Sequence, residues 1–264
     1  MVIENTEAAG SREFLLQWHI TDSCEMDCGH CYIKSSLKKT QFKDLLSTSD
    51  CFRVIDDFKE MSETLRFDGL LYFTGGNPLL REDFFEIFDY AKPKMRRIGV
   101  LGNPSAGIDS ENVRKLKDAG LYRFQISIDG LRDTHESIRG PGSFNLALRG
   151  LDGLINGGIN VAVMSTVTRK NADELPEVMK LSADHGASIY AFARLVPIGE
   201  GLKLYNDMLT PLEYRNLLDR MFREYMELKE KYSSFTMPRK DPMWALYFNE
   251  RGMLPTPTDR LITN

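Results

Sequence analysis

The sequence has little of several features that would place it in a common class of protein. It contains four cysteines in 264 residues, and only three of them lie close together. No apolar run approaches the ~20 residues of a membrane-spanning helix. The net charge is −4, so no excess of positive charge is available to attract nucleic acid or an anionic membrane, and we expect neither as a partner. The N-terminal residues show no basic region followed by an apolar stretch, so we expect a cytoplasmic protein whose thiols stay reduced.

Short β-rich runs alternate with stretches of helical periodicity along most of the chain. Strands are expected over six runs: 14–21, 70–76, 96–102, 121–129, 160–168 and 188–196. Helices are expected between them, over 50–65, 81–92, 110–120, 144–158 and 174–186. A strand followed by a helix, repeated six times, implies parallel strands joined by right-handed crossovers. The pattern therefore predicts an α/β fold, an open six-unit barrel rather than a complete barrel of eight units.

The rhythm changes after this core, which divides the chain into three segments: an N-terminal tail (1–12), the core (13–201) and a C-terminal helical extension (202–264). The extension opens on a predicted amphipathic helix over 210–232, where Thr210, Pro211 and Glu213 match a capping box with proline in the first turn. The proline-punctuated residues that follow are rich in apolar side chains, so we expect them to pack across the barrel.

Three cysteines, Cys24, Cys28 and Cys31, lie within eight residues at the spacing C-x3-C-x2-C. Thiolates select zinc or iron–sulfur clusters, and structural zinc requires four ligands. The remaining Cys51 has no nearby partner and lies on the apolar face of a predicted helix, so we interpret it as a core residue. Three thiolates hold three irons of a cubane and leave the fourth iron open to an exogenous ligand. An open coordination position is where metal sites perform chemistry.

Two further segments stand at the ends of predicted strands. The segment GGNP (75–78) ends the second strand, and glycines there let the backbone approach a neighbour closely. In the fourth strand, Gln125, Ser127 and Asp129 share one face. Buried parallel strands are normally apolar on both faces, so this polar face indicates a wet lumen that holds a ligand. Mutual hydrogen bonding among these side chains is the alternative.

These features together resemble the radical S-adenosylmethionine (SAM) superfamily. The resemblance covers about residues 12–201 and implies a partial (βα)6 radical SAM barrel. It implies that Cys24, Cys28 and Cys31 ligate a [4Fe-4S] cluster whose fourth iron is chelated by SAM. The fourth strand and the residues after it are similar to the SPASM-type subgroup of peptide and protein maturases. No cysteine follows Cys51, so we expect these residues to lack the cysteine-rich C-terminal extension of that subgroup, either because the sequence is a fragment or because this member does without it.

The resemblance also implies contacts to SAM near the cysteines and the second strand. Gly75 and Gly76 match the family segment that meets the amino group of SAM. Asn77 replaces the usual glutamate of that segment, so it brings a hydrogen-bond acceptor without a charge. His30 precedes the last cysteine, where the family usually has an aromatic residue near the adenine.

Further contacts to SAM are implied along the later strands. Ser127 matches a serine that contacts the ribose or the carboxylate of SAM, and Asp129 is its companion. Arg139, twelve residues after that serine, matches an arginine that pairs with the SAM carboxylate. Leu195, at the end of the sixth strand, matches a residue that packs against the adenine.

The activity implied by the resemblance is reductive cleavage of SAM followed by abstraction of a hydrogen atom from the substrate. An external electron donor of flavodoxin or ferredoxin type would reduce the cluster. We expect the substrate to be a peptide or protein, as in ribosomal peptide maturases that install a crosslink or an oxidation. Lys34, Lys38 and Lys39 could meet an acidic leader peptide, although a solvated loop is the simpler interpretation.

Three alternatives remain open at this point. The enzyme could act on a small molecule in cofactor biosynthesis, or it could resemble a sulfatase maturase, for which no catalytic base is evident. A different class of protein, a structural zinc-binding module, would use the three cysteines with His19 or His30 as ligands. The GGNP segment and the polar face of the fourth strand would then be coincidences.

Overall fold

The computed structural model describes residues 12–34, 45–103, 108–238 and 241–253. Six parallel strands form one sheet, and their order in the sheet is their order in the chain. The strands are β1 (Glu13–Thr21), β2 (Asp68–Gly75), β3 (Arg97–Leu101), β4 (Arg123–Ser127), β5 (Val161–Val167) and β6 (Ile189–Arg194). Consecutive parallel order requires every crossover to return on the same side of the sheet, as in a barrel. The predicted partial (βα)6 architecture is confirmed.

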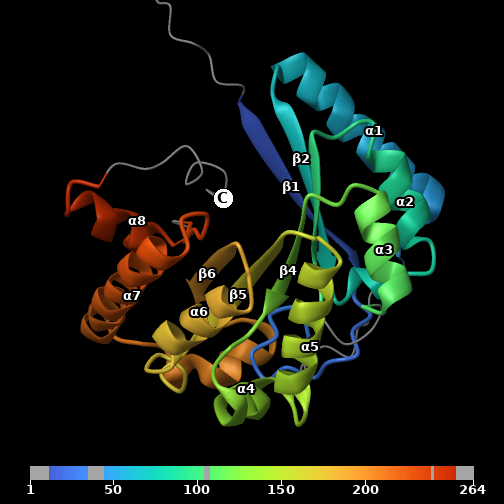
Figure 1. Ribbon diagram of the computed structural model, residues 1–264. Coiled ribbons are helices and arrows are strands. Elements are labelled where there is room, and N and C mark those ends of the chain that lie inside the picture. The colour runs from blue at the N-terminus through green and yellow to red at the C-terminus, as the bar shows by residue number, and fades with distance from the viewer. Residues whose placement is uncertain (1–11, 35–44, 104–107, 239–240, 254–264) are drawn as a thin grey trace, which may run out of the picture.

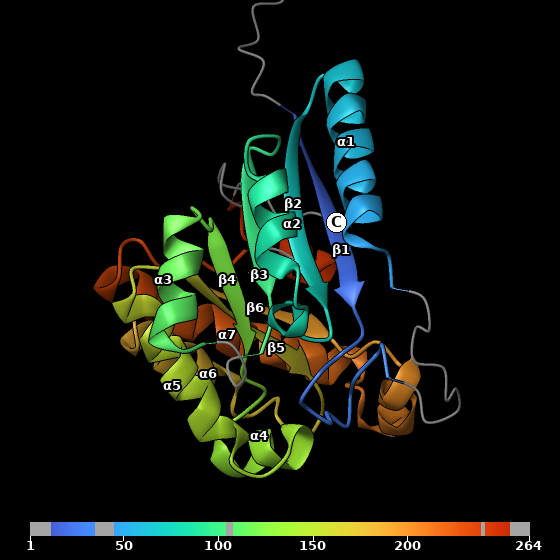
Figure 2. The same cartoon turned by 90° about the vertical axis from the view of Figure 1, so that its right-hand side faces the viewer.

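Helices cover the outer side of this curved sheet. Figures 1 and 2 show α1, α2 and α3 alongside the first strands, and Figure 1 shows α7 and α8 beyond β6. Their bounds are α1 (Thr48–Leu65), α2 (Phe84–Ala91), α3 (Ser110–Asp118), α4 (Arg132–Arg139), α5 (Ser143–Asn156), α6 (Leu175–Asp184), α7 (Pro211–Lys231) and α8 (Pro242–Asn249). Two 3₁₀ segments, η1 (Pro78–Leu80) and η2 (Gly199–Asp207), follow β2 and β6. None of the described helices is both long and apolar enough to cross a membrane.

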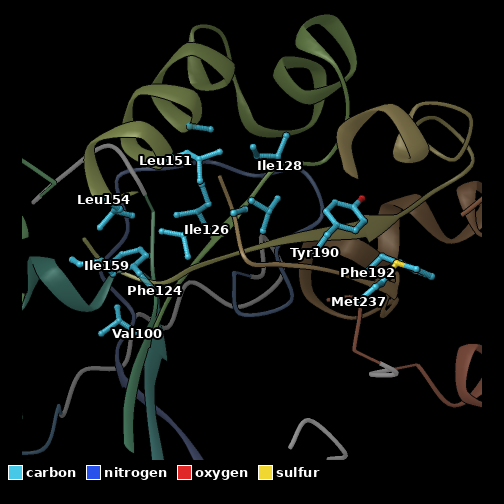
Figure 3. Close-up of a cluster of buried hydrophobic side chains, with 14 of the residues drawn as sticks. Val100, Phe124, Ile126, Ile128, Leu151, Leu154, Ile159, Tyr190, Phe192 and Met237 are labelled. Atoms are coloured by element: carbon cyan, nitrogen blue, oxygen red, sulfur yellow. The ribbon is translucent and has the colours of Figure 1, made fainter. Parts of the chain in front are cut away.

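The two faces of β4 show how the sheet separates core from lumen. Phe124, Ile126 and Ile128 are fully buried, and Figure 3 shows them among apolar side chains of α5 such as Leu151. The alternate residues Arg123, Gln125 and Ser127 are only partly buried and therefore point to the opposite, inner face. Burial of the apolar face drives the helices onto the sheet, which leaves the polar face for the lumen.

The predicted capping box of the C-terminal helix is present. Thr210 accepts a hydrogen bond from the backbone of Glu213, whose carboxylate accepts one from the backbone of Thr210, and Pro211 occupies the first turn. This reciprocal arrangement satisfies donors that the first helical turn leaves free.

The residues after α7 return to the barrel. Thr236 extends the sheet by a parallel bridge to Ile189 of β6. Trp244 of α8 is almost fully buried, and its ring centroid lies 5.6 Å from that of Phe192 on β6. The described part of the C-terminal segment therefore covers the last strand of the sheet.

Candidate active site

The three clustered cysteines lie on the loop that leaves the C-terminal end of β1. Cys24 is exposed, Cys28 and Cys31 are partly buried, and none of them forms a disulfide. The backbone N–H of Gly29 donates to the carbonyl of Ile138 in α4 at 2.8 Å. The N–H of Glu200 in η2 also donates to the carbonyl of Cys31 at 2.9 Å. Two later segments, α4 and η2, thus hold the loop.

Each of the three sulfur atoms has a hydrogen-bond donor directed at it. Asn103 Nδ2 lies 3.1 Å from Cys24 Sγ, the backbone N of Lys34 lies 3.3 Å from Cys31 Sγ, and Arg139 Nη1 lies 3.7 Å from Cys28 Sγ. Burial raises the pKa of the Cys28 thiol to about 11, and the neighbouring guanidinium opposes that rise. Donors of this kind stabilise sulfur that carries negative charge, as it does when it ligates a metal.

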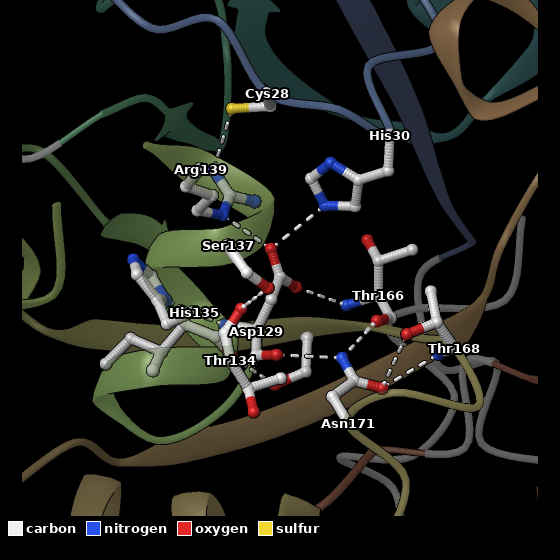
Figure 4. A network of polar contacts seen from close by, with 12 residues as sticks. Cys28, His30, Asp129, Thr134, His135, Ser137, Arg139, Thr166, Thr168 and Asn171 are labelled. Atoms are coloured by element: carbon white, nitrogen blue, oxygen red, sulfur yellow. Dashed lines mark hydrogen bonds and ion pairs between the residues drawn. The ribbon is translucent and has the colours of Figure 1, made fainter. Parts of the chain in front are cut away.

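Asp129, just past the end of β4, is the centre of a buried polar network (Figure 4). Its Oδ2 accepts hydrogen bonds from His30 Nε2 at 2.9 Å and from Arg139 Nε at 2.5 Å, and its Oδ1 accepts from the backbone N of Thr166 at 2.7 Å. Burial alone would raise the pKa of Asp129, but Arg139 and His30 lower it well below its usual range. The residue is therefore ionised, and it joins the cysteine loop, α4 and β5.

The backbone around Asp129 is held in the same way. Its N–H donates to His135 Nδ1 at 3.1 Å, and its carbonyl accepts from Asn171 Nδ2 at 2.8 Å. Both partners are almost completely buried. The sequence predicted no role for His135 or Asn171. Nothing in the residues around them indicates that they hydrogen-bond to the end of β4.

The GGNP segment packs against the start of the cysteine loop. A Cβ on Gly75 would lie 2.0 Å from the carbonyl oxygen of Thr21, and one on Gly76 would lie 2.1 Å from that of Ser23. The N–H of Gly76 donates to the first of these carbonyls at 2.8 Å, and the N–H of Asn77 donates to the second at 2.7 Å. Glycine is required at both positions because any side chain would separate this turn from the loop.

The side chain of Asn77 is fully buried beside a carboxylate. Its Oδ1 caps η1 by accepting from the backbone N of Leu79 at 3.3 Å. Its Nδ2 donates to Glu25 Oε1 at 3.0 Å, and Glu25 follows the first cysteine of the cluster directly. A carboxylate that no motif indicated is thus held next to the position where the family usually has glutamate.

The structure brings most of the sequence-predicted residues to one end of the barrel, but in different surroundings. His30, Asp129 and Arg139 contact one another, so their expected contacts to SAM stay predictions alongside a structural role. Ser127 is partly exposed on the lumen face. Leu195 is 3% exposed and is held by a backbone hydrogen bond to Val167 at the end of β5.

The donor set fits a cubane cluster better than a single metal ion. Within the described ranges, no group of three or more His, Cys, Asp or Glu side chains is placed to hold one metal ion. His30, one of the two histidines that the zinc module required, contacts Asp129 through Nε2 at 2.9 Å. A cubane gives each thiolate a separate iron, so its ligands do not need to converge on one point. Three free thiols, each with a donor at its sulfur, meet that need.

The family profile of the Radical SAM superfamily matches residues 18–182, so the chain belongs to this superfamily. It is an enzyme family that uses a [4Fe-4S] cluster and SAM. The first strand, the cysteine loop and the elements up to α6 all lie within the matched region.

Curated relatives carry several names. The chain is 33% identical over 215 residues to an Fe-coproporphyrin III synthase from Methanosarcina barkeri, which covers 81% of this chain and 52% of that protein. It is 32% identical over 207 residues to an AdoMet-dependent heme synthase from Oleidesulfovibrio alaskensis, covering 78% and 51%. It is 33% identical over 220 residues to the mycofactocin maturase MftC from Mycolicibacterium smegmatis, covering 82% and 53%. The chain spans about half the length of these relatives.

A solved structure shows the same fold. The structure described as native anSMEcpe with bound AdoMet superposes with a TM-score of 0.70 at 18% identity, covering 92% of this chain and 68% of that chain. The partial barrel fold that the resemblance implied is thus confirmed.

Proposed function

We propose that this chain is the catalytic core of a radical SAM enzyme that modifies a small molecule, a tetrapyrrole of the heme type. The observation that carries the proposal is the 33% identity to an Fe-coproporphyrin III synthase across 81% of the chain, accompanied by the match to a heme synthase. This substrate class replaces the peptide as our first choice. A tetrapyrrole falls within the alternative that the sequence left open, a small molecule in cofactor biosynthesis.

The chain's own residues have defined tasks in this proposal. Cys24, Cys28 and Cys31 would ligate the cluster, and the donors beside their sulfurs would stabilise its negative charge. When bound, the cluster and SAM supply one-electron chemistry that generates a radical able to abstract hydrogen. Asp129 would hold Arg139 in place beside Cys28. A flavodoxin- or ferredoxin-type protein would deliver the electron.

In this proposal the remaining contacts to SAM would follow the family pattern. Gly75 and Gly76 keep the backbone of their turn against the cysteine loop, and Asn77 brings Glu25 to the same place. Ser127 faces the lumen, where the ribose or the carboxylate of SAM would lie. We also propose that the core belongs to the SPASM-type subgroup. The similarity to the mycofactocin maturase supports this assignment.

The test uses anaerobically reconstituted protein with SAM, dithionite and coproporphyrin III, with or without iron. We expect release of 5′-deoxyadenosine and a change in tetrapyrrole mass, both read by mass spectrometry. Cys28→Ala should abolish both signals, because it removes a cluster ligand. Cys51→Ala is the matched control and should keep both, because Cys51 is buried in the core. Release of 5′-deoxyadenosine with every tetrapyrrole unchanged would overturn the choice of substrate.

A second candidate, peptide maturation, is favoured by the 33% identity to the mycofactocin maturase. The lysines considered for an acidic leader give it little support. Lys34 Nζ is paired with Asp27 Oδ1 at 2.6 Å, while Lys38 and Lys39 lie outside the described residues. A mass change in a short precursor peptide, under the same conditions, would favour this candidate over the tetrapyrrole.

A further inference from the structure

A second group of polar residues lies on the lumen face, nearer the N-terminal ends of the strands than the cysteine loop. Tyr72 of β2, Gly99 of β3 and Arg123 of β4 are neighbours in register across three strands. A Cβ on Gly99 would lie 1.6 Å from the ring of Tyr72, so the absence of a side chain there makes room for this ring. Phe73, the next residue of β2, is fully buried against α2, which confirms that Tyr72 points to the inner face.

Two guanidinium groups pack on the ring of Tyr122, the residue before Arg123. The Cζ atoms of Arg97 and Arg123 lie 4.7 Å and 4.8 Å from the ring centre of Tyr122. Arg123 Nη2 also donates to the Tyr122 hydroxyl at 3.2 Å. Burial raises the pKa of Tyr72, and both arginines are close enough to oppose that rise. We call Arg97 and Arg123 the lumen arginine pair.

The charge of this pair is only partly balanced. Glu13 Oε1 lies 3.4 Å from Arg97 Nη1, and it is shared with Arg96 at 3.6 Å. No carboxylate of the described residues lies within ion-pair distance of Arg123. Its Nε is buried and has no hydrogen-bond partner among the described residues. An unpaired buried donor is costly, so this Nε–H requires a partner that the described residues do not supply.

The pair faces the same space as the proposed SAM site. Arg123 and Ser127 are on the same side of β4 and four residues apart, so their Cα atoms are separated by roughly 13 Å at ~3.3 Å per residue. A carboxylate held at the pair would leave the rest of an extended organic molecule directed toward Ser127. Guanidinium groups suit this task because they bind carboxylates through two parallel hydrogen bonds.

We propose that Arg97 and Arg123 form a carboxylate-binding site at the base of the lumen, which anchors an anionic substrate of the carboxylated tetrapyrrole class below the reacting centre. The inference rests on the proposed function for its substrate class. The purely structural alternative is that the pair only stabilises the strand ends by packing on Tyr122. That alternative leaves the buried Nε–H of Arg123 without a partner among the described residues.

The probe is coproporphyrin III, which carries four carboxylates, titrated into cluster-loaded protein under anaerobic conditions and followed by its absorbance. Arg123→Gln and Arg97→Gln should each raise the Kd by about tenfold or more, because each removes a charged hydrogen bond to the ligand. Arg123→Lys keeps the charge but loses the planar guanidinium, so its Kd should lie between those of the wild type and Arg123→Gln. The tetramethyl ester of the same porphyrin should bind weakly and show no dependence on either arginine.

The matched control is Arg53→Gln, which makes the same change of charge on the exposed face of α1, where Arg53 pairs with Asp50. It should leave the Kd within about twofold of the wild-type value. Iron content and thermal melting verify that each variant is folded. An unchanged Kd in Arg123→Gln and Arg97→Gln overturns the inference, as does equally tight binding of the ester or no binding of the acid by the wild type.

Failure of the inference can be told apart from failure of the proposed function. If the wild type modifies a tetrapyrrole and both glutamine variants bind it normally, only the carboxylate site is wrong. If the wild type binds coproporphyrin III through the lumen arginine pair and leaves all tetrapyrroles unmodified, only the proposed function is wrong.

Discussion

The carboxylate expected at position 77 is replaced by an asparagine whose side chain contacts a carboxylate on the neighbouring cysteine loop. Similar enzymes have a glutamate at this position that meets the amino group of SAM. Here the amide Nδ2 of Asn77 donates to Glu25 at 3.0 Å, so a carboxylate stands beside the turn on the cysteine loop. A negative charge, which attracts an ammonium group, thus lies beside this turn on a different strand end.

We expect Glu25→Gln to weaken SAM binding on the order of tenfold, because it removes the charged partner of the SAM ammonium. The double variant with Asn77→Glu should restore most of the affinity by returning the carboxylate to the turn. Equilibrium dialysis of SAM against cluster-loaded protein measures the effect. The control is Asp27→Asn, which removes the same charge from the same loop at a residue paired with Lys34. Equal losses in Glu25→Gln and Asp27→Asn would show that only the net charge of the loop matters.

The contacts of the buried network around Asp129 could not be predicted from single residues of the sequence. The spacing of Cys24, Cys28 and Cys31, together with the GGNP segment and the polar face of the fourth strand, indicated the family. The mutual contact of His30, Asp129 and Arg139 was not predictable, because it depends on α4 folding back under the cysteine loop. Each of these three residues was interpreted alone, as a partner of SAM. Their partners in the structure lie up to about a hundred positions away in sequence.

At the scale of elements, the cysteine loop depends on two segments that the sequence did not indicate as regular structure. α4 has eight residues, no side-chain cap and a single aliphatic side chain, so it is too short and too polar to be recognised as a helix from the sequence. η2 begins with Gly199 at φ +61°, a conformation that favours glycine. A Cβ there would meet three backbone oxygens of residues 31, 32 and 34 at 2.6–2.7 Å.

Gly199→Ala should therefore loosen the loop that carries the cluster ligands. We expect a destabilisation of about 2 kcal/mol or more, from the left-handed conformation together with the backbone clash. Iron content per chain after reconstitution should fall with it. Gly153→Ala is the control, since a Cβ at this position in α5 meets no atom within 4 Å, and it should stabilise the helix by up to about 1 kcal/mol. Equal iron content in the two variants would contradict the role of η2.

For the whole molecule, the alternation of strand and helix was enough to predict the barrel. The six strands and the order of the core follow from local periodicity and from the handedness of crossovers. The placement of the residues after α7 was predicted only as packing across the barrel. Their contacts, Thr236 beside β6 and Trp244 on Phe192, join positions more than forty residues apart. Such pairings are set by the assembled surface and leave no local pattern.

Stability of the whole fold should depend on pH through His135. Its ring is buried and accepts a hydrogen bond from the backbone N of Asp129, which requires an unprotonated Nδ1. Burial lowers the pKa of His135 to about 4, and Arg139 adds to this effect while Asp129 opposes it. The unfolded chain, with the ordinary pKa of about 6.5, takes up the proton first as the pH falls. The contribution of neutral His135 to the free energy of unfolding is therefore complete above about pH 6.5 and is lost by about pH 4.

Urea unfolding under anaerobic conditions, at pH 7 and at pH 5, measures this contribution. Between these values we expect His135 to account for a loss of about 2 kcal/mol in the wild type, a loss that should be absent from His135→Gln. Acid effects on the cluster cancel in the comparison, because both proteins carry the same ligands. The low pKa of Asp129 adds its own loss only at lower pH, since a depressed carboxyl pKa stabilises the fold above the unfolded value of about 3.9. If the difference in unfolding free energy between the two proteins is the same at pH 7 and pH 5, His135 is not the group that titrates on unfolding.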